Sequence, residues 1–117
     1  MTNLRNNESV EIIVFTGLPK ISLNEWYAGK HWSERVEWKN TYKLMIRNKY
    51  KGLITFPADV EYQFEFKNNP LDCSNCVAMV KMIEDVIFEK DSPKFVRSVK
   101  VRSKKGTQDK VNIIITY

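Results

Sequence analysis

Between residues 58 and 67, apolar and polar side chains alternate in a regular pattern. The apolar side chains are Val60, Tyr62, Phe64 and Phe66, and the polar side chains are Asp59, Glu61, Gln63 and Glu65. This period of two predicts a β-strand with one buried face and one face in water. Such a strand is stable only in a sheet whose apolar face is covered, so the rest of the chain must supply more strands and a covering layer.

The remaining elements follow from hydrophobic patterns and turn residues. Further strands are expected over Val10–Thr16, about Phe95–Arg102 and Lys110–Thr116. Helices with one apolar face each are expected from Ser33 to about Tyr50 and from Asp72 or Ser74 to about Phe88, and residues 17–32 are expected to form a long loop. The order β-α-β-α-β-β predicts one α+β domain over residues 1–117, with a four-stranded mixed sheet and both helices on one face.

Composition and charge limit the partners and the location that we expect for this chain. The chain has 117 residues, with 19 Lys and Arg against 14 Asp and Glu, which gives a net charge of +5 and favours a polyanionic partner. No apolar stretch is long enough to span a membrane, and the polar N-terminus lacks the apolar core of a signal peptide. We therefore expect a cytoplasmic protein with no membrane partner. The single histidine, His31, excludes a metal site with several histidines.

Two acidic residues flank the second expected helix. Asp72 precedes it and Asp91 follows it, ahead of the next strand. A strand after a helix can return beside the strand before it, which would bring the two carboxylates together, and paired acidic oxygens are ligands for Mg²⁺. Alternatively, Asp72 caps the helix and Asp91 shapes a turn before Pro93.

Three short motifs carry a resemblance to a known family. The segments LDCSN, KMIED and EKDSPKFV resemble the RusA family of Holliday junction resolvases, which is common in phages and prophages. The segment SLNEWYAGKHW is also similar to a loop of the phage-type members. The resemblance extends from about Leu18 to Ile115.

The resemblance implies an activity and partners. It implies a magnesium-dependent endodeoxyribonuclease of the crossover junction type, which cuts four-way junctions or other branched DNA in recombination and repair. It also implies a homodimer, since symmetric cleavage needs two active sites. The place of action would be the cytoplasm of a bacterial host, where a phage or prophage protein works.

By the same resemblance, Asp72 and Asp91 match the magnesium ligands, and Asn75 matches the Asn of the family motif. Ser74 stands where the family has a second Asp. Its hydroxyl can ligate Mg²⁺ but adds no charge, so we expect a lower metal affinity and a weaker activity. Position 90 is Lys rather than an acid, which leaves Glu89 as a substitute ligand.

The helix lysine of the family has no direct match. Ala78 occupies its position, and Lys81 lies three residues further on, close to one helical turn away. Lys81 would then stabilise charge near the scissile phosphate as a catalytic residue. The alternative is a solvated lysine that pairs with Asp85 at i,i+4.

DNA contacts are expected from cations in the long loop, the first helix and the third strand. These cations are Lys30, His31, Arg35, Arg97, Lys100, Arg102, Lys104 and Lys105. Phosphate contacts by such groups supply most of the sequence-independent affinity for DNA, although each one alone is more often a solvated surface charge. Trp26 and Trp32 are expected to anchor the loop in the core, with stacking on an unpaired base as the alternative.

Two other functions compete with this one. A branched-DNA-binding protein with weakened catalysis is suggested by Ser74. A thiol oxidoreductase is suggested by the CSNC tetrapeptide, Cys73 to Cys76, at the start of a helix. Against it, Cys76 falls on the apolar arc of that helix, where a cysteine serves as a small hydrophobic side chain. Two thiols cannot complete a structural zinc site within one chain.

Overall fold

The computed structural model describes residues 9–28, 32–89 and 93–117, and the fold is that of these residues. Its elements in chain order are β1 (Val10–Thr16), α2 (Leu23–Tyr27), α3 (Trp32–Lys49), β2 (Ala58–Phe66), the short 3₁₀ helix η1 (Cys73–Cys76), α4 (Val77–Ile87), β3 (Val96–Lys105) and β4 (Lys110–Thr116). The predicted α+β class and its four strands are confirmed. Each of the four strands begins and ends within a few residues of its expected position.

The four strands form one mixed sheet in the order β1-β4-β2-β3. β4 is antiparallel to both β1 and β2, whereas β2 and β3 run parallel. The parallel pair requires a crossover connection, which η1 and α4 provide. On β2 the predicted alternation is confirmed, because every apolar position is buried and every polar position between them is partly exposed.

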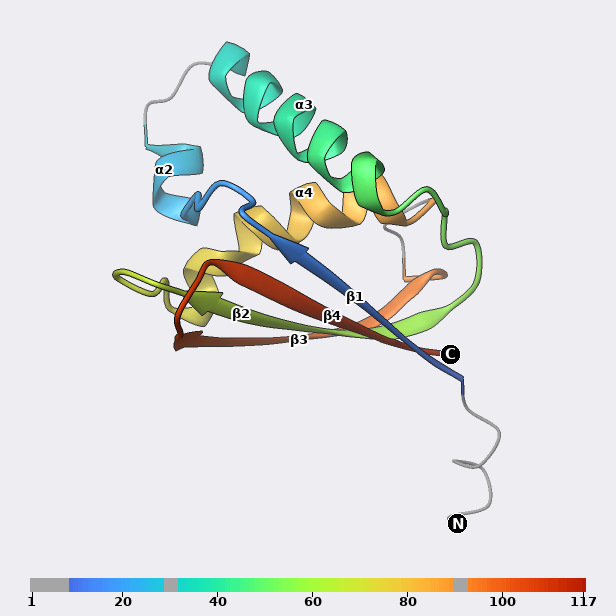
Figure 1. The fold of residues 1–117 in the computed structure, drawn as a ribbon. Coiled ribbons are helices and arrows are strands. Elements are labelled where there is room, and N and C mark those ends of the chain that lie inside the picture. The colour runs from blue at the N-terminus through green and yellow to red at the C-terminus, as the bar shows by residue number, and fades with distance from the viewer. Residues whose placement is uncertain (1–8, 29–31, 90–92) are drawn as a thin grey trace.

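Both long helices lie on the same side of the sheet, as expected, but they form two layers (Figure 1). α4 lies against the sheet and α3 packs across α4. Eight of the eleven residues of α4 are buried, and the exposed ones are Val77, Lys81 and Asp85. The expected apolar face of α4 is confirmed, but it is wider than the sequence pattern indicated, since Ala78, Met82 and Glu84 are also buried in a helix covered from two sides. α3 buries only Tyr42 and Ile46.

Residues 17–32 are not one long loop, because they contain α2. Ser22 caps this helix: its Oγ accepts the N–H of Glu25 at 3.0 Å, and the Glu25 carboxylate accepts the N–H of Ser22 at 3.1 Å. This reciprocal pair is a capping box, whose sequence signature S-x-x-E is present at residues 22–25. α3 begins at Trp32, so Ser33 lies inside the helix and is not its cap.

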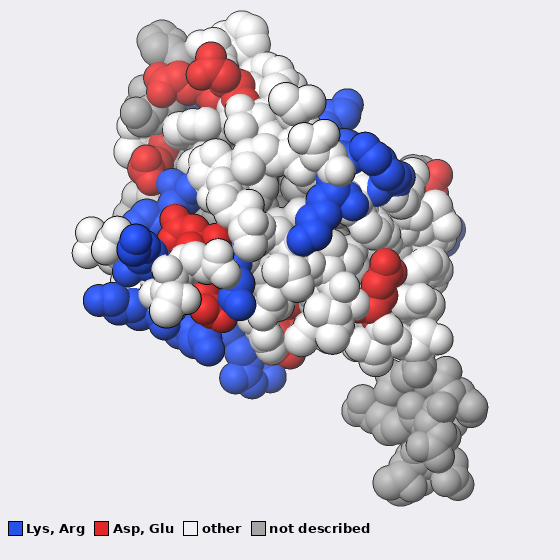
Figure 2. All heavy atoms as spheres, in the orientation of Figure 1, with Lys and Arg blue, Asp and Glu red and all other residues white. Residues whose placement is uncertain are grey.

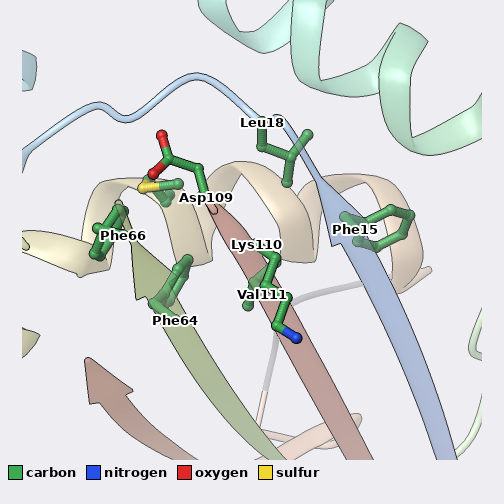
Figure 3. Close-up of a pocket in the computed structure, with 8 residues that line it drawn as sticks. Phe15, Leu18, Phe64, Phe66, Asp109, Lys110 and Val111 are labelled. Carbon is green, nitrogen blue, oxygen red and sulfur yellow. The ribbon is translucent and has the colours of Figure 1, made fainter. Parts of the chain in front are cut away.

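The interior is closely packed. A small cavity at one end of the sheet is lined by Phe15, Leu18, Phe64 and Phe66 among others (Figure 3). Its volume is about 10 Å³, which is about the room that one water needs. This cavity is a packing imperfection and not a ligand site.

One hydrogen bond ties the segment between β1 and α2 to α3, and it supplies a test of the fold. The buried Tyr42 hydroxyl donates to the Pro19 carbonyl at 2.5 Å. Burial raises the pKa of Tyr42, so the hydroxyl stays a donor at ordinary pH.

Tyr42→Phe leaves that carbonyl without its donor, and we expect a loss of about 1–2 kcal/mol in the free energy of unfolding, measured by urea denaturation. Tyr27→Phe, at an exposed ring, is the control and should change stability by less than about 0.5 kcal/mol. Equal stabilities for both variants would contradict the bond.

Candidate active site

Asp72 begins the crossover as the cap of η1. Its Oδ1 accepts the backbone N–H of Asn75 at 2.9 Å, and its backbone is extended, as a cap requires. The capping interpretation is thus confirmed. Asp72 and Ser74 are both exposed. Within the described part of the chain, no hydrogen bond engages Oδ2 of Asp72, so this oxygen can accept a ligand.

The turn that carries Asp72 is held against β3 and α2. The Ser103 hydroxyl donates to the Leu71 carbonyl, and Cys73 Sγ donates to the Val101 carbonyl at 3.4 Å. On the other side, Asn75 Oδ1 accepts the backbone N–H of Asn24 at 3.3 Å. We call residues 71–75 the acidic turn. Two elements far apart in the sequence, α2 and β3, therefore fix its place.

Asp91 lies outside the described residues, but its described neighbours are at the far end of α4 from Asp72. The Glu89 N–H donates to the Ile54 carbonyl at 3.0 Å, and the Ala58 N–H donates to the Phe95 carbonyl at 2.8 Å. Both bonds lie at the start of β2, whereas the acidic turn lies beyond its end. η1 and α4 separate the two places by roughly 20–25 Å. Glu89 therefore cannot share a metal ion with Asp72 in one chain, and its expected role as a substitute ligand is wrong.

The described residues offer Mg²⁺ a single carboxylate at the acidic turn. Among residues 9–28, 32–89 and 93–117, no group of three or more His, Cys, Asp or Glu side chains could hold a metal ion. Mg²⁺ commonly takes one or two carboxylates and completes its shell with water and phosphate oxygens. Asp72 supplies one such carboxylate, and the exposed Ser74 lies two residues from it in the same turn.

Lys81 lies on the exposed stripe of α4, between Val77 and Asp85. It is about one and a half helical turns beyond the end of η1, and Asp85 follows it at i,i+4. The structure thus places Lys81 in solvent, on the helix that starts at the acidic turn. Its role in catalysis stays a prediction.

The cations of β3 face carboxylates of β2 on the open side of the sheet. Arg97 pairs with Asp59 at 3.2 Å, Arg102 with Glu61 at 2.9 Å, and Lys104 with Glu65 at 4.0 Å. The register of the parallel pair produces this ladder, since Lys100, Arg102 and Lys104 align with Glu61, Gln63 and Glu65. A hydrogen bond from Gln63, with help from Lys100 and Arg102, lowers the pKa of Glu61. Three of the predicted DNA contacts therefore already have acidic partners.

Lys and Arg side chains gather at the end of the sheet where β3 ends and β4 begins, with a few acids among them (Figure 2). A hollow of about 480 Å³ opens there, and Cys73, Arg102 and Lys104 are among its lining residues. Lys105, also predicted to bind DNA, is exposed at the end of β3. Cys73 of the acidic turn therefore lines the same hollow as β3, whereas Asp72 is not among the lining residues.

A second group of predicted contacts lies between α2 and α3. The Arg35 guanidinium lies 5.7 Å from the ring centre of Trp26 and 5.9 Å from that of Tyr27. Trp26 is partly buried, packs against the core and stacks on Trp38, so it anchors α2 as expected. Trp32 is 73% exposed, so its expected anchoring role is wrong. Lys30 and His31 lie outside the described residues.

The two cysteines are free thiols with different surroundings. Cys73 is exposed, whereas Cys76 is fully buried, and burial raises the pKa of Cys76 to about 11. A high pKa keeps this sulfur in the unreactive thiol form. Cys76 belongs to the hydrophobic core, as expected for a small apolar side chain. This packing gives the thiol oxidoreductase hypothesis no support.

Comparison with known proteins finds no family model that matches the chain and no curated protein that matches it. The resemblance to the RusA family therefore stays a prediction. In the described part of the chain, no helix has both the length and the apolar character needed to cross a membrane.

The cap of η1 gives a test that is independent of any metal. Asp72→Ala removes the oxygen that accepts the Asn75 N–H, and we expect a loss of about 1 kcal/mol in the free energy of unfolding. Asp72→Asn should stay near the parent, because Asn caps about as well as Asp. Urea denaturation measures both, with Ser74→Ala as the control in the same helix. A loss in Asp72→Asn as large as that in Asp72→Ala would show that charge, not capping, stabilises the turn.

Proposed function

We propose that this chain is a magnesium-dependent endonuclease that acts on four-way junctions or other branched DNA, as a homodimer, in recombination and repair. The observation that supports the proposal most directly is the contact between the acidic turn and β3. The Ser103–Leu71 and Cys73–Val101 hydrogen bonds hold the turn that carries Asp72 against the strand that carries the cations.

The two parts suit complementary tasks on a DNA backbone. Lys and Arg side chains bind phosphates and position the strand. A carboxylate can hold a divalent cation that also contacts a phosphate oxygen; when bound, Mg²⁺ would supply an activated water and offset charge on the phosphate. In this arrangement Asp72 holds the metal, Ser74 adds a neutral ligand, and Lys81 stabilises charge near the leaving group.

The ion pairs of β3 leave this strand able to bind DNA. β3 carries five cations and β2 carries three carboxylates, so an excess of positive charge remains. Exposed ion pairs contribute only about 0–1 kcal/mol each, so a phosphate can compete for their cations. The carboxylates would then set the orientation of Arg97 and Arg102 before DNA binds.

A second candidate is a branched-DNA-binding protein with weakened catalysis. One observation favours it: the described residues place a single carboxylate at the acidic turn, and Ser74 adds no charge there. The experiment that separates the two is metal-dependent cleavage of a labelled four-way junction.

Substitution of the two carboxylates tests the endonuclease proposal. Asp72→Asn removes the carboxylate of the acidic turn, and we expect it to abolish Mg²⁺-dependent cleavage or to reduce it at least about 100-fold, the effect of about 2.7 kcal/mol at the transition state. Asp91→Asn makes the same charge change, but its described neighbours lie at the other end of α4, so we expect a smaller effect on cleavage. Junction binding should stay equal or tighten slightly, because a repulsive charge is gone. Cleavage and gel-shift affinity are measured on the same preparations, with Asp109→Asn as a control acid at the β3–β4 turn. Parental cleavage by Asp72→Asn would make Asp72 a structural residue and would contradict the proposed metal site.

The dependence of DNA affinity on salt concentration tests the role of the β3 cations. We expect the affinity for a four-way junction to fall steeply with salt concentration, and Lys100→Gln with Lys105→Gln to reduce the log–log slope by about 2, or about 0.9 per lost phosphate contact. Lys49→Gln with Lys51→Gln, at the other end of the helical layer, makes the same charge change and should leave the slope nearly unchanged. Equal slopes for the two double variants would show that binding follows the net charge of the protein and not a specific interface on β3. Linear duplex of equal length should compete less well than the junction.

A further inference from the structure

Two large aromatic side chains stand in solvent where α2 meets α3. Tyr27 is 65% exposed and Trp32 is 73% exposed, whereas their neighbour Trp26 is packed against the core. Exposed aromatic groups of this size are costly to leave in water, and they commonly mark a binding surface. The anchoring of α2 needs Trp26 and not these two rings.

Two cations accompany the exposed rings. On α3, Trp32, Arg35 and Lys39 have the spacing i, i+3, i+7, which puts them on one side of the helix. Arg35 lies over the rings of Trp26 and Tyr27, and Lys39 Nζ lies 5.7 Å from the ring centre of Trp26. We call Trp26, Tyr27, Trp32, Arg35 and Lys39 the aromatic–cation cluster.

Arg35 has an unused donor in this cluster. Its Nε is buried and has no hydrogen-bond partner within the described part of the chain. A buried polar atom without a partner is uncommon in a folded protein. Two rings hold the guanidinium in place, and because Nε is buried, an acceptor from outside the chain would meet the terminal nitrogens of this partly exposed side chain.

We propose that the aromatic–cation cluster binds an unpaired nucleobase of DNA. The base stacks on Tyr27 or Trp32, and the adjoining phosphate lies on Arg35 and Lys39. Rings beside cations are the combination that binds single strands, because every base has a face that stacks and every phosphate attracts a cation. A purely apolar partner would leave both cations without a counter-charge.

The cluster is placed to act together with the acidic turn. α2 is about 7.5 Å long, and the N–H of Asn24 in its first turn bonds Asn75 of the acidic turn. One bound strand can therefore contact both places. The inference rests on the proposed function for its partner, DNA, and deepens it: an intact duplex offers no unpaired base, so the cluster would favour branched or single-stranded DNA.

The test measures binding without Mg²⁺, so that it does not depend on cleavage. Fluorescence anisotropy follows a labelled oligothymidine and a labelled linear duplex with the parent, with Tyr27→Ala plus Trp32→Ala, and with Leu44→Ala. Leu44 is the matched control, because it is 70% exposed on the same helix but lies outside the cluster. We expect the ring variant to lose about 5- to 100-fold in affinity for oligothymidine, and less than about twofold for the duplex. Leu44→Ala should bind both DNAs as the parent does, and Trp32→Phe should retain most of the affinity.

Three results would overturn the inference: parental oligothymidine binding by the ring variant, an equal loss for both DNAs, or an equal loss in Leu44→Ala. Circular dichroism confirms that each variant is folded. Failure of the two proposals is distinguishable, because a parent that binds oligothymidine through the rings but cuts no junction overturns only the endonuclease. A parent that binds neither DNA overturns both.

Discussion

The burial of α4 between the sheet and α3 is the packing arrangement on which the other features depend. α4 joins two parallel neighbours, so its ends must lie at opposite ends of the sheet. Each fully buried aliphatic side chain of this helix contributes about 1.5–3 kcal/mol, which fixes the direction of the crossover. That direction places the acidic turn beside the second half of β3 and places Glu89 beside Ile54. The same packing that stabilises the fold thus decides which polar groups can meet.

Much of the fold could be predicted because its signals are local. The alternation on β2 and the β-branched run of β4 depend only on neighbouring residues, and both strands are where the sequence predicted them. α2 was missed although its S-x-x-E signature is present, because Pro19 and Asn24 suggested a loop. The layering of α3 on α4 could not be predicted, since the pattern of a helix shows which side is apolar but not what covers it.

The candidate site likewise has some features that could be predicted from the sequence and others that could not. The capping role of Asp72 follows from its position before an apolar helix, and the cations of β3 are plain in the sequence. Their acidic partners depend on the register between β2 and β3, which is set by contacts between distant segments. Ser103 and Asn24, which hold the acidic turn in place, carry no local signal at all. The exposure of Trp32 was likewise beyond sequence reasoning, because a tryptophan is ordinarily buried.

β3 is also an edge strand, and its charges have a consequence for the isolated protein. One side of β3 has no neighbouring strand; apart from the Val101 carbonyl, which accepts a hydrogen bond from Cys73, another chain could extend this side as an added strand, the first step of edge-to-edge aggregation. Five cations along ten residues oppose that step, because two such edges repel each other. β1, the other edge, exposes Val10 and Ile12 and has no lysine or arginine. Repulsion between cations therefore opposes strand addition at β3 but not at β1, so self-association through strand addition would begin at β1.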